Sequence, residues 1–272
     1  MKRMPWLKLA LIPVVLLLSC ATTGPGGKQS LVLIPTGQEV AIGAQMAQQV
    51  EATEKRLQDS TWQVYLTEIG NRIVRICDRQ DIEYHFTVIE SDVVNAFAAP
   101  GGYIYFYTGL LREMDSEAEL AAVMAHEISH VVARHGIKRL QKALGVALAY
   151  ELVLGGNSSE TIEAAVGVGM GLLFAGYSRE AEREADNFGL YYMIKAGYDP
   201  NGMLDMFATL TELGGGGSTN LFERLARSHP ETEERIANTR TQLMLQQPLA
   251  PSLVMSRDKY QTMLRRLPAK QP

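Results

Sequence analysis

The segment "AHEISHVVARH", residues 125–135, places two histidines four positions apart, with a glutamate directly after the first. Residues four apart on an α-helix lie about 40° apart around its axis, so His126 and His130 can bind one cation. Glu127 can then act as general base on a water at that cation, as in the H-E-x-x-H motif. Because the surrounding residues are apolar, these polar side chains would be costly to bury without a partner. The segment therefore predicts one Zn²⁺ per chain, rather than two histidines that only form hydrogen bonds.

A catalytic zinc site needs a third protein ligand and keeps a fourth position open. In the metzincin pattern the third ligand would be a histidine at position 136, but the chain has Gly136 there. His135 lies one position away, and we expect it to have a role at a helix end instead. A glutamate on a later helix is the alternative third ligand.

The segment "SREAEREADNFG", residues 178–189, offers three glutamates on one predicted helix. Glu180 and Glu184 share a polar stripe and are expected to meet solvent, whereas Glu182 lies next to an apolar stripe. Asp186 lies on the same face as Glu182, and like charges at this spacing repel each other. A metal on Glu182 and a ligand histidine that donates to Asp186 would resolve the conflict, and we predict these roles. The alternative is a solvated helix whose own arginines pair with the acids.

Capping signals indicate where the neighbouring helices begin. Ser116 and Glu119 predict the start of the helix with the two histidines, and Thr36 and Glu39 predict another start. The apolar segment 141–177 favours a buried helix or a cover over a cleft. Further helices are predicted at about 60–77, 178–197 and 201–213, and after Pro230.

Two strand signals precede the histidine helix. "DIEYHFTVIE" alternates apolar and polar residues, and "VVNAFAAPGGYIYFYTG" predicts two strands around residues 100–102. A strand at the edge of such a hairpin can accept a peptide substrate as an added strand. The predicted fold class is therefore α+β and mostly helical, with a small sheet or hairpin beside the H-E-x-x-H helix.

The N-terminus is typical of exported bacterial proteins. A cationic start is followed by a ten-residue apolar run, which is short for a membrane span and fits a signal peptide. The run ends in Leu-Leu-Ser-Cys, which resembles a lipobox and implies lipidation of Cys20. Ala21 after it hints at sorting to the outer membrane. An ordinary signal peptide or short anchor is the alternative.

Three motifs together carry a family resemblance. HEISH, S-R-x-x-E-x-E-A-D and S-H-P resemble the gluzincin metallopeptidases of family forty-eight, related to HtpX, Oma and the CAAX prenyl endopeptidase. The similarity extends from about residue 35 to 240 and is greatest to the periplasmic lipoprotein branch that includes LoiP and the BepA catalytic domain. The resemblance implies a zincin-like fold with His126, His130 and Glu182 as zinc ligands, Glu127 as base and Asp186 behind a ligand. It also implies that Asn95, Ala96 and Phe97 lie beside the cleft and bind substrate; an ordinary buried strand is the alternative.

His229 in "SHP" resembles a family position that can approach zinc as a fourth, regulatory ligand. It could otherwise stabilise the oxyanion during catalysis, or simply cap a helix. The expected function is a lipid-anchored zinc endopeptidase of the periplasm that acts on unfolded or misassembled envelope proteins. One alternative is a latent or chaperone-like protein whose zinc site is blocked by His229, and another is a structural lipoprotein without metal.

Composition agrees with one peptidase domain. The chain has 272 residues, is 46% hydrophobic and carries a net charge of −4, which gives no basic surface for nucleic acid. With Cys20 lipidated, Cys77 has no disulfide partner. We expect a signal peptide at 1–19, the lipidated cysteine and a tether at 20–34, the peptidase domain at 35–247 and a tail at 248–272.

Overall fold

A computed structural model of the protein describes residues 20–22, 29–154, 159–215, 225, 228–229, 233–246, 249 and 253–270. The signal peptide predicted at 1–19 lies outside these residues. Within the expected tether, strand β1 (Cys20–Thr22) pairs antiparallel with strand β2 (Gln29–Leu31). Among the described helices, none is both long and apolar enough to cross a membrane.

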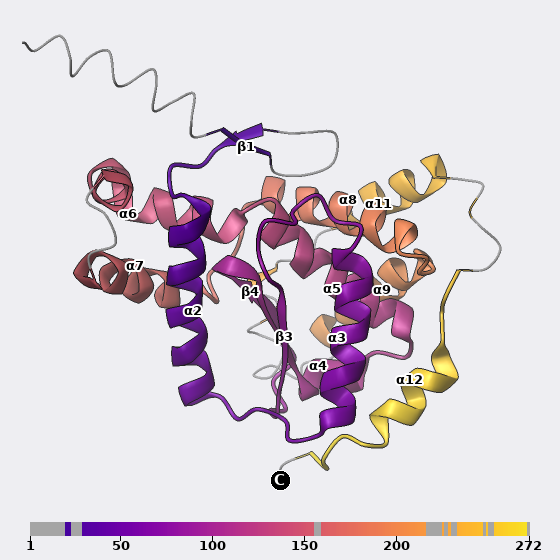
Figure 1. Ribbon diagram of the computed structural model, residues 1–272. Helices are drawn as coiled ribbons and strands as arrows, with labels where there is room; N and C mark the ends of the chain where they lie inside the picture. The colour runs from indigo at the N-terminus through magenta and orange to yellow at the C-terminus, as the bar shows by residue number, and fades with distance from the viewer. Residues whose placement is uncertain are drawn as a thin grey trace, which may run out of the picture.

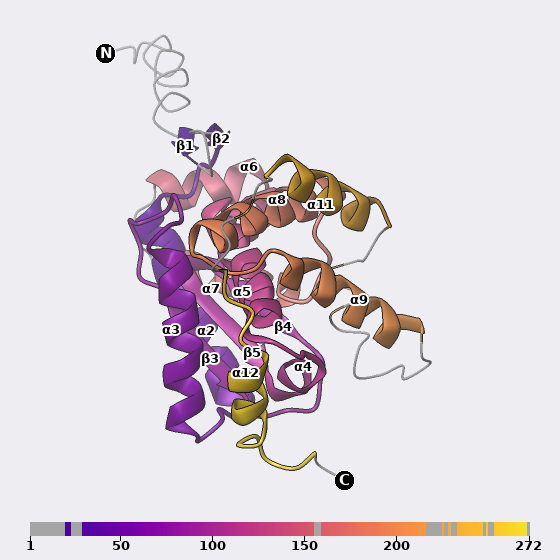
Figure 2. The same ribbon diagram turned by 90° about the vertical axis from the view of Figure 1, so that its right-hand side faces the viewer.

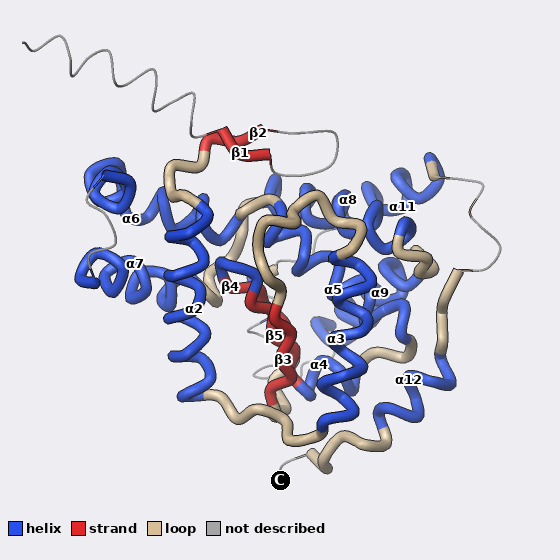
Figure 3. Tube along the Cα trace, viewed as in Figure 1, coloured by secondary structure: helices blue, strands red, loops and turns tan. Residues whose placement is uncertain are grey.

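A three-stranded sheet lies in the middle of the molecule (Figure 3). It consists of β3 (His85–Ile89), β4 (Ala96–Ala99) and β5 (Tyr103–Tyr107), in the order β3-β5-β4. The predicted hairpin is confirmed, because β4 and β5 pair antiparallel around a 3₁₀ turn at Pro100–Gly102. Gly102 has φ 94°, and an added Cβ would lie 2.2 Å from the Glu83 carbonyl oxygen, so only glycine fits this turn. β4 is an edge strand of the sheet.

Alternation along the strands sends side chains into two separate cores. In β5, Ile104 and Phe106 join one core, and Tyr105 and Tyr107 join the other. Figures 1 and 2 show helix α2 (Thr36–Thr53) on one side of the strands and helix α3 (Ser60–Val74) on the other. The remaining helices are α4 (Thr108–Glu113), α5 (Glu117–Val132), α6 (His135–Leu154), α7 (Ser159–Leu172), α8 (Arg179–Lys195), α9 (Asn201–Gly215), α11 (Glu233–Leu245) and α12 (Arg257–Leu264). The predicted fold class, mostly helical α+β, is confirmed.

Helix α5 is the centre of the fold, because each of its residues is buried. It begins as predicted: the Ser116 hydroxyl accepts a hydrogen bond from the Glu119 backbone N–H at 3.2 Å and donates to the Glu119 carboxylate at 2.9 Å. Helix α8 packs closely against α5 at Gly189, where an added Cβ would lie 3.1 Å from the backbone nitrogen of His126. This approach sets the distance between the two helices that carry the candidate metal ligands.

The capping box predicted at Thr36 and Glu39 is wrong. Helix α2 begins at Thr36 after Pro35, and no side chain caps it. Glu39 is instead buried and accepts hydrogen bonds from Arg79, at 2.8 and 2.9 Å, and from Arg134 Nε at 2.8 Å. Arg79 also donates to the Val131 carbonyl at 2.9 Å, so this cluster ties α2 to the C-terminal end of α5.

The segment expected as a tail is packed onto the domain. Tyr260 of α12 is fully buried and donates to the Leu111 carbonyl at 2.7 Å. The Trp62 indole N–H donates to the Met263 carbonyl at 3.0 Å. The run of regularly spaced apolar residues in this segment is short, and the residues that it contacts lie more than a hundred positions earlier in the chain. The sequence pattern therefore does not predict a packed helix here.

Candidate metal centre

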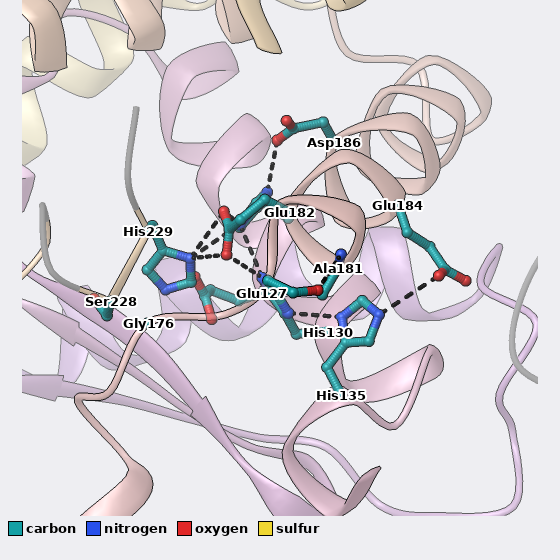
Figure 4. Close-up of polar contacts among 12 residues, drawn as sticks. Glu127, His130, His135, Gly176, Ala181, Glu182, Glu184, Asp186, Ser228 and His229 are labelled. Atoms are coloured by element: carbon teal, nitrogen blue, oxygen red, sulfur yellow. Dashed lines mark hydrogen bonds and ion pairs between the residues drawn. The ribbon is translucent and has the colours of Figure 1, made fainter. Parts of the chain in front are cut away.

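Four side chains from three parts of the chain converge beside helix α5. His126 and His130 project from α5, Glu182 from α8, and His229 from the segment before α11. The Nε2 atoms of His126 and His130 lie 3.0 Å apart, and the Glu182 oxygens lie 3.5 and 3.6 Å from them. His229 Nδ1 lies 3.1 Å from Glu182 Oε1 and 3.3 Å from His126 Nε2. Figure 4 shows His229, Glu182 and His130 facing one another.

The spacing of these donors fits a tetrahedral metal ion. Zinc bonds of about 2.1 Å to nitrogen or oxygen imply donor atoms about 3.4 Å apart around a tetrahedron. Five of the six donor pairs lie 3.0–3.6 Å apart, close to that value, and all four ligand atoms lie within 4.8 Å of one another. All four side chains are buried. Bringing their lone pairs and negative charge together without a cation would therefore cost free energy. The set could therefore hold a metal ion.

Asp186 contacts the His126 ring on the side away from the other donors, as predicted. It also has a cationic partner, Arg235, which the sequence pattern does not predict. Asp186 Oδ1 lies 3.0 Å from His126 Nδ1. Arg235 of α11 donates from Nε and Nη2 to the two Asp186 oxygens at 2.7 and 2.8 Å, and its Nη1 lies 3.0 Å from Glu182. The only sequence signal for Arg235 was indirect: two inward acids on α8 had no cation at helical spacing.

These contacts shift the proton affinities of the site in the absence of metal. Burial disfavours a charged ring at His126, but the carboxylates of Asp186 and Glu182 outweigh it and raise the pKa of His126 to about 10. Burial also opposes charge on Glu182, yet His229 and His126 hold its pKa well below the usual value. His130, buried beside the other histidines, has a pKa well below its usual value and is neutral. His126 thus carries a proton in the metal-free site that a metal ion must displace.

Glu127 lies at the site but outside the set of converging donors. Its Oε1 is 3.6 Å from His229 Nε2, and the Ala98 backbone of β4 is close enough to act on the pKa of the carboxylate. Burial raises the pKa of Glu127, although the two nearby histidines oppose the shift. A cavity of about 30 Å³ adjoins Glu127 and His126 and is otherwise lined mostly by apolar side chains. The carboxylate is therefore placed between β4 and the histidines.

The three predicted substrate residues lie at the start of β4, and their side chains are buried. Asn95 and Ala96 have no exposed surface, and Phe97 stacks on Tyr105 at a ring distance of 4.9 Å in the core on the α2 side. These three side chains therefore lie in the protein interior rather than on an open surface.

The expectation that Glu184 meets solvent is wrong. Its side chain is 15% exposed and lies 3.6 Å from His135 Nε2. His135 lies at a helix end as expected, as the first residue of α6, and its Nδ1 lies 2.8 Å from His130 Nδ1. Tyr177 stacks on the His130 ring at 4.2 Å. The helical faces of α5 and α8 do not predict these contacts, because His135 reaches Glu184 from the start of α6. Glu180, by contrast, is exposed as expected.

Comparison with known proteins agrees with this geometry. The sequence matches peptidase family M48 over residues 60–243. It is 32% identical over 227 residues to the putative beta-barrel assembly-enhancing protease of Vibrio cholerae, covering 79% of this chain and 46% of that protein. It is 32% identical over 178 residues to the mitochondrial metalloendopeptidase OMA1 of Schizosaccharomyces pombe, covering 64% of this chain and 50% of that protein. Metalloprotease YcaL of Escherichia coli is 29% identical over 162 residues, or 58% of this chain and 62% of that protein.

The chain thus spans about half the length of the first two of these relatives. The family match runs from the start of α3 into α11 and includes both histidines of α5, Glu182 and His229. It covers more than half of the chain, and the resemblance found in the three motifs is confirmed. The chain therefore belongs to peptidase family M48, a family of metallopeptidases.

Proposed function

We propose that the chain is a zinc endopeptidase of the bacterial envelope that hydrolyses unfolded or misassembled proteins. The observation that carries the proposal is the convergence of His126, His130 and Glu182 with Glu127 beside them. Two imidazoles and one carboxylate are a donor set that catalytic zinc sites use. His126, His130 and Glu182 would hold the ion, and Asp186 and Arg235 would orient His126 and Glu182.

The chain's own residues supply the proton transfers of peptide hydrolysis. Zinc, when bound, supplies a Lewis acid that polarises the scissile carbonyl and acidifies a water molecule. Glu127 accepts a proton from the attacking water and returns it to the leaving nitrogen. Burial raises the pKa of Glu127, which favours a group that must hold the proton before it returns it. His229 lies close enough to Glu127 to stabilise negative charge on the carbonyl oxygen.

The edge strand β4 is the proposed substrate platform. An extended peptide would add to the edge of β4 at Asn95, Ala96 and Phe97, as peptides do at other open sheet edges. It would pair with the backbone groups that do not already bond to β5, since the Asn95 carbonyl accepts from the Tyr107 N–H at 3.0 Å. Recognition through main-chain hydrogen bonds demands an extended, unfolded segment rather than a particular sequence. The names of the assembly-enhancing relatives support envelope proteins as the substrate class.

The proposed location is the periplasmic side of the outer membrane, through lipid on Cys20 after removal of residues 1–19. The lipobox-like sequence and the residue that follows it support this. The peptidase domain would then comprise residues 35–247, with the described residues 253–270 of the expected tail packed against it. Labelling with a palmitate analogue in cells tests the anchor, and Cys20→Ser should abolish labelling.

A second candidate is a latent form of the same enzyme. His229 Nδ1 lies within 3.3 Å of both His126 and Glu182, where a fourth ligand would exclude the attacking water. The two forms predict different results in a casein assay with the full chain in detergent. Activity in the wild type that is lost in Glu127→Gln and on chelation supports the endopeptidase. An inactive wild type that gains activity as His229→Ala supports the latent form, and no activity in any form contradicts both.

A further inference from the structure

The Nδ1 atom of His130, on the side of the ring away from the candidate metal ligands, faces a second imidazole. His130 Nδ1 and His135 Nδ1 lie 2.8 Å apart, and His135 Nε2 lies 3.6 Å from Glu184 Oε2. Figure 4 shows the three side chains in one row, from α5 through the start of α6 to α8. Both histidines are buried, and the Glu184 side chain is 15% exposed.

The row has one consistent hydrogen-bond direction. His130 Nε2 faces the other donors, so a metal there requires the proton of this ring on Nδ1. His135 Nδ1 must then accept, because two N–H groups cannot face each other at 2.8 Å. Its own proton is consequently on Nε2, which lies 3.6 Å from Glu184 Oε2 in an electrostatic contact that is longer than a hydrogen bond. Glu184 therefore selects the tautomer of His135, and His135 selects that of His130.

The backbone between α5 and α6 is strained in a way that makes the row possible. Arg134 has φ 54°, a left-handed conformation that side-chain-bearing residues rarely adopt. On an unbroken helix, residue 135 would lie about 140° around the axis from His130 and could not face it. The turn at Arg134 brings His135 back beneath His130. Buried contacts from Arg134 to Glu39 and to the Ile34 carbonyl, at 2.8 and 2.7 Å, hold this conformation.

We propose that His135 and Glu184 are positioning residues that fix the tautomer and orientation of His130 for metal binding. The inference rests on the metal site of the proposed function and adds a second support to it. His126 is held directly by a carboxylate, whereas His130 is held by an imidazole that a carboxylate orients. Removal of such an outer partner lowers metal affinity about 10- to 100-fold in other sites.

The test measures zinc affinity by chelator competition at one pH, in the full chain. We expect a loss of about 10- to 100-fold in His135→Ala and in Glu184→Ala, and little further loss in the double variant. Glu184→Gln should stay within about threefold of wild type, because its amide oxygen still accepts from His135. Glu180→Ala is the matched control, since Glu180 is an exposed glutamate on the same helix.

Chemical rescue separates positioning from a purely structural role. A cavity of about 560 Å³ is lined by both His135 and Glu184, so free imidazole can reach the space that His135→Ala leaves. Added imidazole should restore zinc affinity in His135→Ala but not in Glu184→Ala. Wild-type affinity in His135→Ala, equal loss in Glu180→Ala, or absence of rescue in a folded variant would overturn the inference. A wild type that binds no zinc would instead overturn the proposed function.

Discussion

Arg235 donates two parallel hydrogen bonds to the Asp186 carboxylate, from Nε at 2.7 Å and from Nη2 at 2.8 Å. The third guanidinium nitrogen lies 3.0 Å from Glu182, so one cation from α11 contacts two buried carboxylates of α8. Asp186 has a lowered pKa because these contacts outweigh its burial. The metal site therefore depends on a residue that is 49 positions from Asp186 and has no motif of its own.

Replacement of Arg235 by alanine should strongly destabilise the metal-free protein. Two buried carboxylates would lose the guanidinium group and keep only their histidine contacts, and breaking a buried pair in this way costs about 3–5 kcal/mol. Urea unfolding monitored by circular dichroism measures this loss. Arg183→Ala is the control, because the Arg183–Glu234 pair is exposed on both sides and should contribute less than about 1 kcal/mol. Equal stability of the two variants would contradict the assigned role of Arg235.

The buried Glu39 gives a second stability prediction. A helix cap would be worth about 1 kcal/mol, whereas a buried carboxylate between Arg79 and Arg134 should cost about 3–5 kcal/mol when it is removed. Glu39→Ala should therefore lower the free energy of unfolding by the larger amount. Thr36→Ala, at the position expected to cap, should change it little, because Thr36 bonds only to the exposed side chain of Asp81. A cost for Thr36→Ala as large as that for Glu39→Ala would restore the capping interpretation.

Local patterns predicted the parts of the fold in which near neighbours decide the structure. The Ser116 cap, the helix period of α5 and the turn at Pro100–Gly102 each depend on a few adjacent residues. The same period brought Glu182 to the inner face of α8, where the structure places it facing His126 and His130. These inferences needed only the geometry of one helix and the cost of burying charge.

What the sequence did not reveal are contacts between distant segments. The sequence around Arg235 and around Glu39 does not mark either residue as buried. Only the tertiary fold buries these two charged side chains. His135 was assigned elsewhere because a straight helix points it away from His130, and the left-handed Arg134 changes that direction. Such a backbone strain has no local signal, since it is imposed by the buried contacts with Glu39.

The packed C-terminal segment predicts that truncation is costly. Loss of residues 253–272 would expose the apolar surface that Tyr260 and Met263 cover and would leave the Trp62 indole N–H without its acceptor. We expect the truncated chain to melt several degrees lower and to be cut faster by trypsin, although it keeps every candidate ligand. Tyr260→Phe should lose about 1–2 kcal/mol through the unsatisfied Leu111 carbonyl. Unchanged melting of the truncated chain would show that α12 contributes nothing to stability.

Zinc binding should release about one proton per chain near neutral pH. With its pKa raised to about 10, metal-free His126 is protonated at pH 6.5, and zinc needs its Nε2 lone pair. His130 is already neutral and Glu182 already ionised, so neither adds to the release. Affinity should consequently rise about tenfold per pH unit below the pKa of His126.

Calorimetry of the Glu127→Gln variant in buffers of different ionisation enthalpy measures this release. The substitution removes the other carboxylate with a raised pKa, and pH 6.5 lies below the pKa of about 7 of water on zinc. Asp186→Asn should release fewer protons, because the carboxylate that holds the proton on His126 is gone. Binding with no dependence on the buffer would mean that His126 is neutral before zinc arrives. In that case Asp186 would only orient the ring, and the charge balance of the site would rest on Arg235 alone.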